Sequence, residues 1–159
     1  MLSVKFITVG NLKENYLREA VAEYSKRLGG LCKFEIIQLK EAYLPENPSQ
    51  TEIDAALESE GEKILAKMPP RSYKIAMCVE GTQMSSEKFA KKIEQISTTA
   101  NEIFFIIGSS HGISDNVKRA CDFRMSISEL TFPHQLMRVV LLEAVYRALN
   151  IIKGTKYHK

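Results

Sequence analysis

The sequence predicts an α/β domain with a mostly parallel sheet and helices on both of its faces. Two kinds of segment alternate along the chain. Some have the alternating or continuously apolar pattern of strands, and the others have the 3.6-residue apolar period of helices. Two segments, Tyr73–Val79 and Glu102–Ile107, are almost continuously apolar, which is typical of strands buried in a parallel sheet. No linker-like stretch interrupts this order, so we expect residues 1–159 to form a single domain.

The apolar spacing and the capping residues place the individual elements. The expected strands are Leu2–Val9, Lys33–Leu39, Tyr73–Val79, Glu102–Ile107 and Phe123–Ile127. The expected helices are Glu14–Leu28 before Gly29-Gly30, one from a capping box of Thr51 and Asp54 to Pro69-Pro70, one from Ser85 or Ser86 to about Ser97, a short one after Ser114, and His134–Ile152.

Composition and charge narrow the class of protein. The 22 Lys and Arg residues against 19 Asp and Glu give a formal net charge of +3, which is compatible with nucleic acid without demanding it. No apolar run approaches the roughly 20 residues of a membrane span, and the first residues predict a strand instead of a leader peptide. We therefore expect a cytoplasmic protein without a membrane partner, whose cysteines at 32, 78 and 121 are packed thiols.

A ligand site is expected at the carboxyl ends of three strands. In open α/β sheets ligands gather at this edge, which here comprises Met77–Gly81, Ile107–Gly112 and Ile127–Pro133. Gly108 and Gly112 either let the backbone approach a ligand or only form a turn. Because neither GxGxxG nor GxxxxGK[ST] occurs, a standard dinucleotide fingerprint and a P-loop are excluded.

Pro133 fixes how the chain passes from the last strand into the last helix. It lacks an N–H group and forces Phe132 toward an extended conformation. A loop held in this way can offer its backbone N–H and C=O groups to an adenine edge, with Leu130 and Phe132 as apolar walls.

The last helix is apolar around almost its whole circumference, which predicts burial on all sides. In a domain this small, the second covering surface is expected to be another subunit, and thus a two-fold homodimer. Glu143 and Arg147 are spaced for an i,i+4 ion pair or for a functional role. His134, which shares a face with Arg138, is either a helix-start residue that packs against the loop or a functional group.

A metal site is not expected. His111, Cys121 and His134 are residue types that can bind zinc, but they have no recognised ligand spacing.

The C-terminal motifs resemble those of the RlmH family, the smallest SPOUT-class methyltransferases. They are Leu130-Thr131-Phe132-Pro133-His134-Gln135-Leu136-Met137-Arg138-Val139, then Glu143-Ala144-Val145-Tyr146-Arg147-Ala148, and the terminal Tyr157-His158-Lys159. The resemblance extends over essentially the whole chain. It implies an α/β fold with a C-terminal trefoil knot, a homodimer, and S-adenosylmethionine as cofactor. The implied reaction is methylation of N3 of a pseudouridine in 23S ribosomal RNA, within the large subunit or the assembled ribosome.

The resemblance also implies which residues bind the cofactor. By motif they are Met77, Gly108, Ile127, Ser128, Glu129, Leu130, Thr131 and Phe132. One position departs from the family pattern: Ser109 stands where a second glycine is usual, with His111 further along the loop, so the details of cofactor packing differ here.

The chemistry of the implied reaction selects candidate catalytic residues. The pseudouridine N3 carries a proton that a base must accept before the nitrogen can attack a methyl group. The candidates are His158 or Glu143 as base, with Arg147 or Arg138 stabilising an anionic oxygen or phosphate, and Tyr157 stacking on or orienting a nucleobase. We expect the tail that carries Tyr157 and His158 to fold over the cofactor site, of its own subunit or of the partner.

Two other function classes remain open at this point. One is a non-catalytic adenine-nucleotide-sensing α/β module, which would bind the same ligand without needing Tyr157 and His158. The other is a ribosome-associated binding protein without a cofactor.

Overall fold

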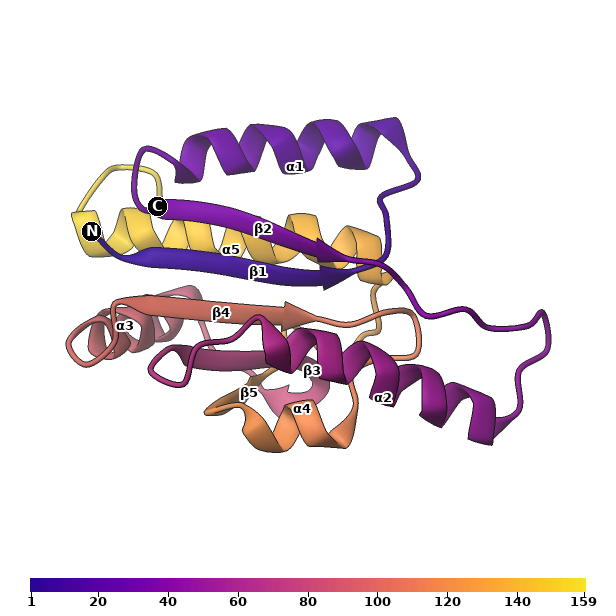
Figure 1. The fold of residues 1–159 in the computed structure, drawn as a ribbon. Coiled ribbons are helices and arrows are strands. Elements are labelled where there is room, and N and C mark those ends of the chain that lie inside the picture. Colours follow the sequence, from indigo (N-terminus) through magenta and orange to yellow (C-terminus); the bar gives the residue numbers. More distant parts are fainter.

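The computed structural model describes all residues, 1–159, and contains a three-layer α/β arrangement (Figure 1). The strands are β1 (Ser3–Val9), β2 (Lys33–Leu39), β3 (Tyr73–Thr82), β4 (Glu102–Ile107) and β5 (Phe123–Met125). The helices are α1 (Asn15–Leu28), α2 (Gln50–Ala66), α3 (Ser86–Ser97), α4 (Asp115–Ala120) and α5 (His134–Lys153).

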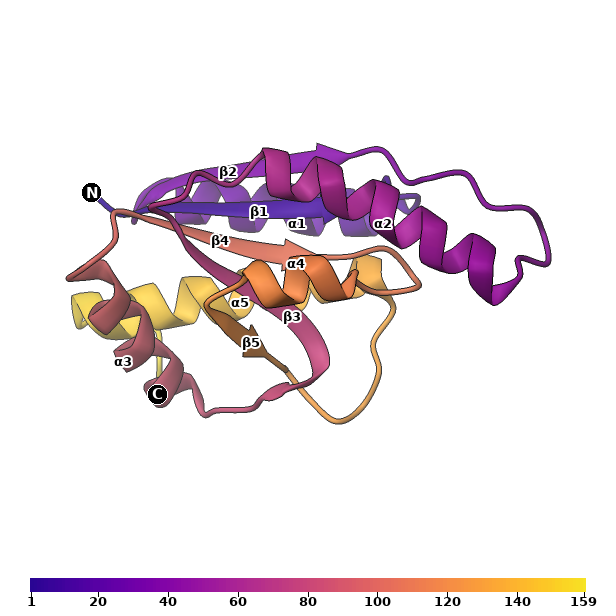
Figure 2. The ribbon, with the colours of Figure 1, turned by 60° about the horizontal axis from the view of Figure 1, so that its bottom comes forward.

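All five strands are parallel, in the order β2-β1-β4-β3-β5. One face of the sheet packs against α1, α3 and α5 through the larger apolar core, which includes Phe6, Phe105 and Leu141. The other face is covered by α2 and α4 over a smaller core around Phe104 and Ile106. Figures 1 and 2 show the two groups of helices on opposite sides of the sheet. The predicted fold class is confirmed.

The expected elements are present, with corrections at some of their ends. Helix α2 begins earlier than predicted because Ser49, not Thr51, is its N-cap. The Ser49 hydroxyl accepts the Glu52 N–H at 3.1 Å, and the Glu52 carboxylate accepts the Ser49 N–H at 3.2 Å. Thr51 lies inside the helix and is not its N-cap, so it does not form the predicted capping box with Asp54. The Asp54 carboxylate instead accepts the side-chain amide of Gln50 at 2.8 Å.

Strand β3 is longer than predicted and β5 is shorter, for a common reason. Both Met77 and Thr82 pair with Met125 of β5, so that the four residues between them bulge out of the ladder. Gly81 is required in this bulge, because a Cβ there would lie 2.6 Å from the Met125 backbone. The Ser126 N–H donates to the Thr82 carbonyl at 3.0 Å, and the chain then leaves the sheet before Ile127.

Helix α5 spans the face of the sheet from its carboxyl edge to its amino edge (Figure 1). Its inner side is buried through Leu141, Leu142 and Val145, between α1 and α3. An outer stripe of Leu136, Val140 and Ala144 is not fully covered within one chain, so the expected burial on all sides would need a second covering surface. None of the helices, α5 included, has the length and apolarity needed to cross a membrane.

Candidate functional site

A cavity of about 620 Å³, here called the strand-end cavity, lies at the carboxyl ends of β3, β4 and β5. Its walls come from the three segments that the sequence singled out. The expected cofactor contacts that line it are Met77, Gly108, Ile127, Ser128, Leu130, Thr131 and Phe132. Glu129 does not line it and is exposed to solvent.

The loop after β4 needs glycine for its own geometry. A Cβ on Gly108 would overlap the carbonyl oxygen of Gly112. Gly112 itself has φ of +94°, in the left-handed region, and its N–H donates to the Ser109 carbonyl at 2.9 Å. Both glycines therefore form the turn, and the same tight turn brings backbone to the cavity wall. Ser109 is buried within this turn, whereas His111 is exposed at the cavity wall.

The loop between β5 and α5 leaves most of its backbone donors free. The Ser126 hydroxyl donates to the Ser128 carbonyl at 2.9 Å, and the Ser128 hydroxyl accepts the Leu130 N–H at 3.0 Å. The N–H groups of Ile127, Thr131 and Phe132 donate to no other group in the chain. Such a wall offers hydrogen-bond donors beside apolar side chains, which suits a flat heterocycle.

Of two residues in the first turns of α5, one lines the cavity and the other is buried in the protein. His134 lines the cavity and is half-buried; burial, and secondly the nearby Arg138 guanidinium, lower its pKa. Arg138 is only 2% exposed, and its Nη2 donates to the carbonyls of Val9 and Gly10 at 3.0 and 2.7 Å. The guanidinium is thus committed to the end of β1, which corrects its interpretation as a group that stabilises an anion of the substrate.

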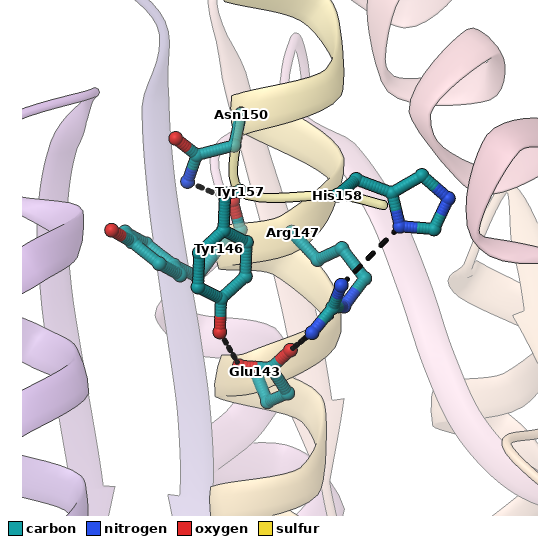
Figure 3. Close-up of polar contacts among 6 residues, drawn as sticks. All are labelled: Glu143, Tyr146, Arg147, Asn150, Tyr157 and His158. Carbon is teal, nitrogen blue, oxygen red and sulfur yellow. Dashed lines mark hydrogen bonds and ion pairs between the residues drawn. The ribbon is translucent and has the colours of Figure 1, made fainter. Parts of the chain in front are cut away.

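The remaining catalytic candidates form one connected network on α5 and the tail, residues 154–159 (Figure 3). The Tyr157 hydroxyl donates to Glu143 Oε2 at 2.7 Å, and Arg147 Nε donates to Glu143 Oε1 at 2.8 Å. The Arg147 guanidinium lies over the Tyr157 ring at 4.6 Å from its centroid, and the Tyr146 ring meets that ring edge-on at 4.8 Å. Both carboxylate oxygens of Glu143 are therefore engaged.

His158 connects this network to α3. Its Nδ1 lies 3.3 Å from Arg147 Nη1, and its Nε2 lies 2.8 Å from Glu87 Oε1. Because Arg147 can only donate, Nδ1 is the acceptor, and Nε2 carries the proton that Glu87 accepts. The contacts thus place the donor at Nε2 and the acceptor at Nδ1.

The pKa values of the network describe an ionised carboxylate that is well satisfied. Burial acts to raise the pKa of Glu143, but hydrogen bonds from Tyr157 and Arg147 outweigh it and hold the pKa below its usual range. Burial, then the hydrogen bond to Glu143 and the charge of that carboxylate, raises the pKa of Tyr157, and the same causes raise the pKa of Tyr24 to about 12. Glu143 is consequently a weak base, and the tyrosines stay protonated near neutral pH.

Within one chain, the network and the strand-end cavity are separate. Neither Glu143 nor Arg147 lines the cavity, and neither does Tyr157 or His158. The chain's C-terminus lies toward the amino edge of the sheet, whereas α5 begins at the carboxyl edge (Figure 1). The tail therefore does not fold over the cavity of its own subunit.

Sequence reasoning missed two parts of these sites. Glu87 contacts His158 from 71 positions away in the chain, and no spacing rule connects them. The ion pair of Glu80 and Lys118, with a distance of 2.6 Å between Oε1 and Nζ, stands in the cavity wall. A glutamate directly after a buried strand was the one available signal for it.

The structure does not bring His111, Cys121 and His134 together. No group of three or more His, Cys, Asp or Glu side chains is placed to hold a metal ion, so the zinc hypothesis lacks a site.

Comparisons with known proteins agree with this arrangement. A family model described as "Predicted SPOUT methyltransferase" matches residues 2–158. Ribosomal RNA large subunit methyltransferase H of Streptococcus thermophilus (strain ATCC BAA-491 / LMD-9) is 51% identical over 159 residues, which cover 99% of this chain and 100% of that protein. The protein of the same name from Limosilactobacillus reuteri (strain DSM 20016) is 46% identical over the same shares. The chain therefore belongs to the SPOUT methyltransferase family, within the group that ribosomal RNA large subunit methyltransferase H represents.

Proposed function

We propose that this protein methylates N3 of a pseudouridine in 23S ribosomal RNA, with S-adenosylmethionine as methyl donor and as a homodimer in the cytoplasm. The observation that carries the proposal is the strand-end cavity, whose walls are the segments that the family motif assigns to the cofactor. The activity follows the name of relatives about half identical over their full length.

The residues of the cavity fit the proposed cofactor. A volume of about 620 Å³ suits a ligand of this size, and the free N–H groups of Ile127, Thr131 and Phe132 can bond the edge of an adenine ring. The close packing at Gly108 lets backbone form the opposite wall. When bound, the cofactor supplies an electrophilic methyl group; the chain must hold the acceptor nitrogen in line with it.

The homodimer is supported by the outer stripe of α5. Leu136 is 37% exposed, and Val140 and Ala144 are half-buried at the next turns. A second copy that packs its own stripe here would form a two-fold contact in which the same residues meet. We infer that it also brings a second tail to the cavity, which the chain's own tail does not line.

His158 is the better candidate for the base that takes the N3 proton. Both oxygens of Glu143 accept hydrogen bonds, and its pKa is lowered, so this carboxylate is a poor proton acceptor. The Nδ1 atom of His158 has one contact, at 3.3 Å from Arg147 Nη1, which is longer than the 2.8 and 2.7 Å hydrogen bonds that engage the two oxygens of Glu143. We assign Glu143 and Arg147 to positioning Tyr157 and the tail, and Tyr157 to stacking on the nucleobase.

The test uses ribosomes that lack the modification. The protein is incubated with methyl-labelled S-adenosylmethionine and with free 23S RNA, large subunits or whole ribosomes, and the label is mapped. Label at N3 of one pseudouridine supports the proposal and identifies the substrate. Binding of the cofactor without label in any RNA would instead indicate a sensing module, and ribosome binding that S-adenosylmethionine does not affect would indicate a binding protein.

Deletion of Lys156–Lys159 tests whether the tail takes part in methyl transfer. We expect cofactor binding to persist, because the tail does not line the cavity, and methyl transfer to fall at least about 100-fold with the loss of the base. Full activity of the shortened protein would remove the tail from the mechanism.

A further inference from the structure

A second, shallower depression, here called the edge hollow, adjoins the strand-end cavity next to the edge strand β5. It encloses about 520 Å³ between α4, β5 and the bulge of β3. Glu80 and Lys118 belong to the walls of both spaces, so their ion pair forms the partition. A group bound in the edge hollow would therefore lie directly beside the occupant of the cavity.

Two arginines border the edge hollow without a carboxylate partner. Arg119 lies in the last turn of α4, and within the chain its guanidinium bonds only the side-chain oxygen of Asn116. Arg124 is exposed on β5, and its side chain takes part in no hydrogen bond or ion pair within the chain. Both guanidinium groups thus have donors available to a ligand.

The balance of charge in the edge hollow favours an anion. Its carboxylates are Glu80, which is paired with Lys118, and Asp122, which accepts the backbone N–H of Lys74 at 2.8 Å. Asp122 is therefore the one carboxylate in the hollow that is not paired with Lys118. Because Arg119 and Arg124 outnumber it, the walls carry a net positive charge. A large apolar ligand has little to contact here besides Phe123.

We propose that the edge hollow binds a backbone phosphate of the RNA substrate, next to the nucleotide that is methylated. This inference rests on the function proposed above and names the part of the substrate that this edge holds. The planar fork of a guanidinium matches two phosphate oxygens. A phosphate contact fixes the position of the RNA without reading its sequence.

The test measures ribosome methylation by Arg119→Ala, Arg124→Ala and the double variant at several salt concentrations. Each substitution is expected to raise KM for ribosomes about tenfold and to reduce the slope of log KM against log salt by about 0.7 to 0.9. The Kd for S-adenosylmethionine and kcat should change by less than about twofold, since neither arginine lines the cavity. Arg124→Lys, which keeps the charge but not the fork, should recover part of the loss.

Two further variants test whether KM changes in the direction that the charge of the edge hollow predicts. Asp122→Asn keeps an oxygen for the Lys74 N–H but removes a charge that repels phosphate, so KM should fall about two- to threefold. Arg71→Ala is the matched control, because it removes an exposed arginine just before β3 that does not line the edge hollow. If the double variant has the KM and salt slope of Arg71→Ala, the phosphate site is wrong. A wild-type protein that methylates no ribosome would overturn the proposed function instead.

Discussion

At the scale of single residues, Gly108 carries the sharpest steric constraint in the strand-end cavity. Gly108→Ala forces a Cβ against the Gly112 carbonyl, so the turn must shift. We expect a loss of stability of about 1–3 kcal/mol and a weakening of S-adenosylmethionine binding by at least about tenfold, as for other overpacked sites. Thermal unfolding and calorimetric titration measure the two effects. Gly30→Ala is the control, because the nearest contact of its Cβ, the Arg27 carbonyl oxygen at 3.5 Å, is ordinary; an equal loss in both variants would contradict the steric argument.

His134 gives the stability of the protein a predictable dependence on pH. Its pKa is lowered in the folded chain, first by burial and then by Arg138, from the ordinary value of 6.5. Below about pH 6.5 the unfolded chain therefore binds more protons at this residue than the folded chain. The free energy of unfolding should fall as the pH drops from 7.5 to 5.5, and His134→Gln should lose part of this fall.

The measurement for His134 is the urea midpoint of both proteins across that range of pH. It avoids the lower range, in which the carboxylates with lowered pKa values, such as Glu143, also begin to take up protons. Parallel curves for the wild type and the variant would show that His134 does not contribute.

At the scale of elements, Arg138 fastens the first turns of α5 to the end of β1. Arg138→Ala leaves the carbonyls of Val9 and Gly10 without their donor and opens a cavity in a site that is 2% exposed. We expect a loss of about 2–4 kcal/mol in urea unfolding, because buried polar groups lose their partner. Exposed Arg71→Ala is the comparison and should change stability by less than about 0.5 kcal/mol.

The outer stripe of α5 is the proposed contact between the two subunits, and a substitution in it tests that proposal. Val140→Asp places a charge in the middle of the proposed two-fold contact and should yield a monomer in sedimentation velocity. Leu65→Asp is the control, since Leu65 is 36% exposed on α2, on the other face of the sheet. A Val140→Asp protein that sediments like the wild type would move the interface away from α5.

The limits of sequence-based prediction also differ between elements. The alternation of strands and helices follows from periods of 2 and 3.6 residues, so all the elements could be predicted, and the glycines and Pro133 located the cavity segments. The bulge of β3 could not be foreseen, because it depends on one residue, Met125, that pairs twice. Nor could the site of Arg138 be foreseen: its spacing places it one turn after His134, but its partners come from β1, more than a hundred positions away.

At the scale of the whole molecule, the order of elements did not reveal the C-terminal trefoil knot of the SPOUT family fold, which only the resemblance to that family supplied. The same holds for the relation between the tail and the cavity. The sequence predicted that Tyr157 and His158 belong to a functional tail. Within one chain, however, neither residue lines the strand-end cavity, and His158 contacts Glu87 instead. The proposed homodimer would reconcile the two, if the tail of one subunit acted on the cavity of the other.

Mixing two defective subunits tests whether the site is shared. One subunit carries His158→Ala and keeps its cavity; the other carries Gly108→Ala and keeps its tail. At a concentration of S-adenosylmethionine well below the Kd of the Gly108→Ala cavity, each homodimer should have little activity. If the tail acts on the partner's cavity, each mixed dimer has one complete site, so random exchange should restore about one quarter of wild-type activity, because half of the dimers then carry one of two sites. If tail and cavity act within one subunit, every site in every dimer has a defect and mixing restores nothing. Adding Val140→Asp to both subunits should abolish the recovery, since the mixed dimer could then not form.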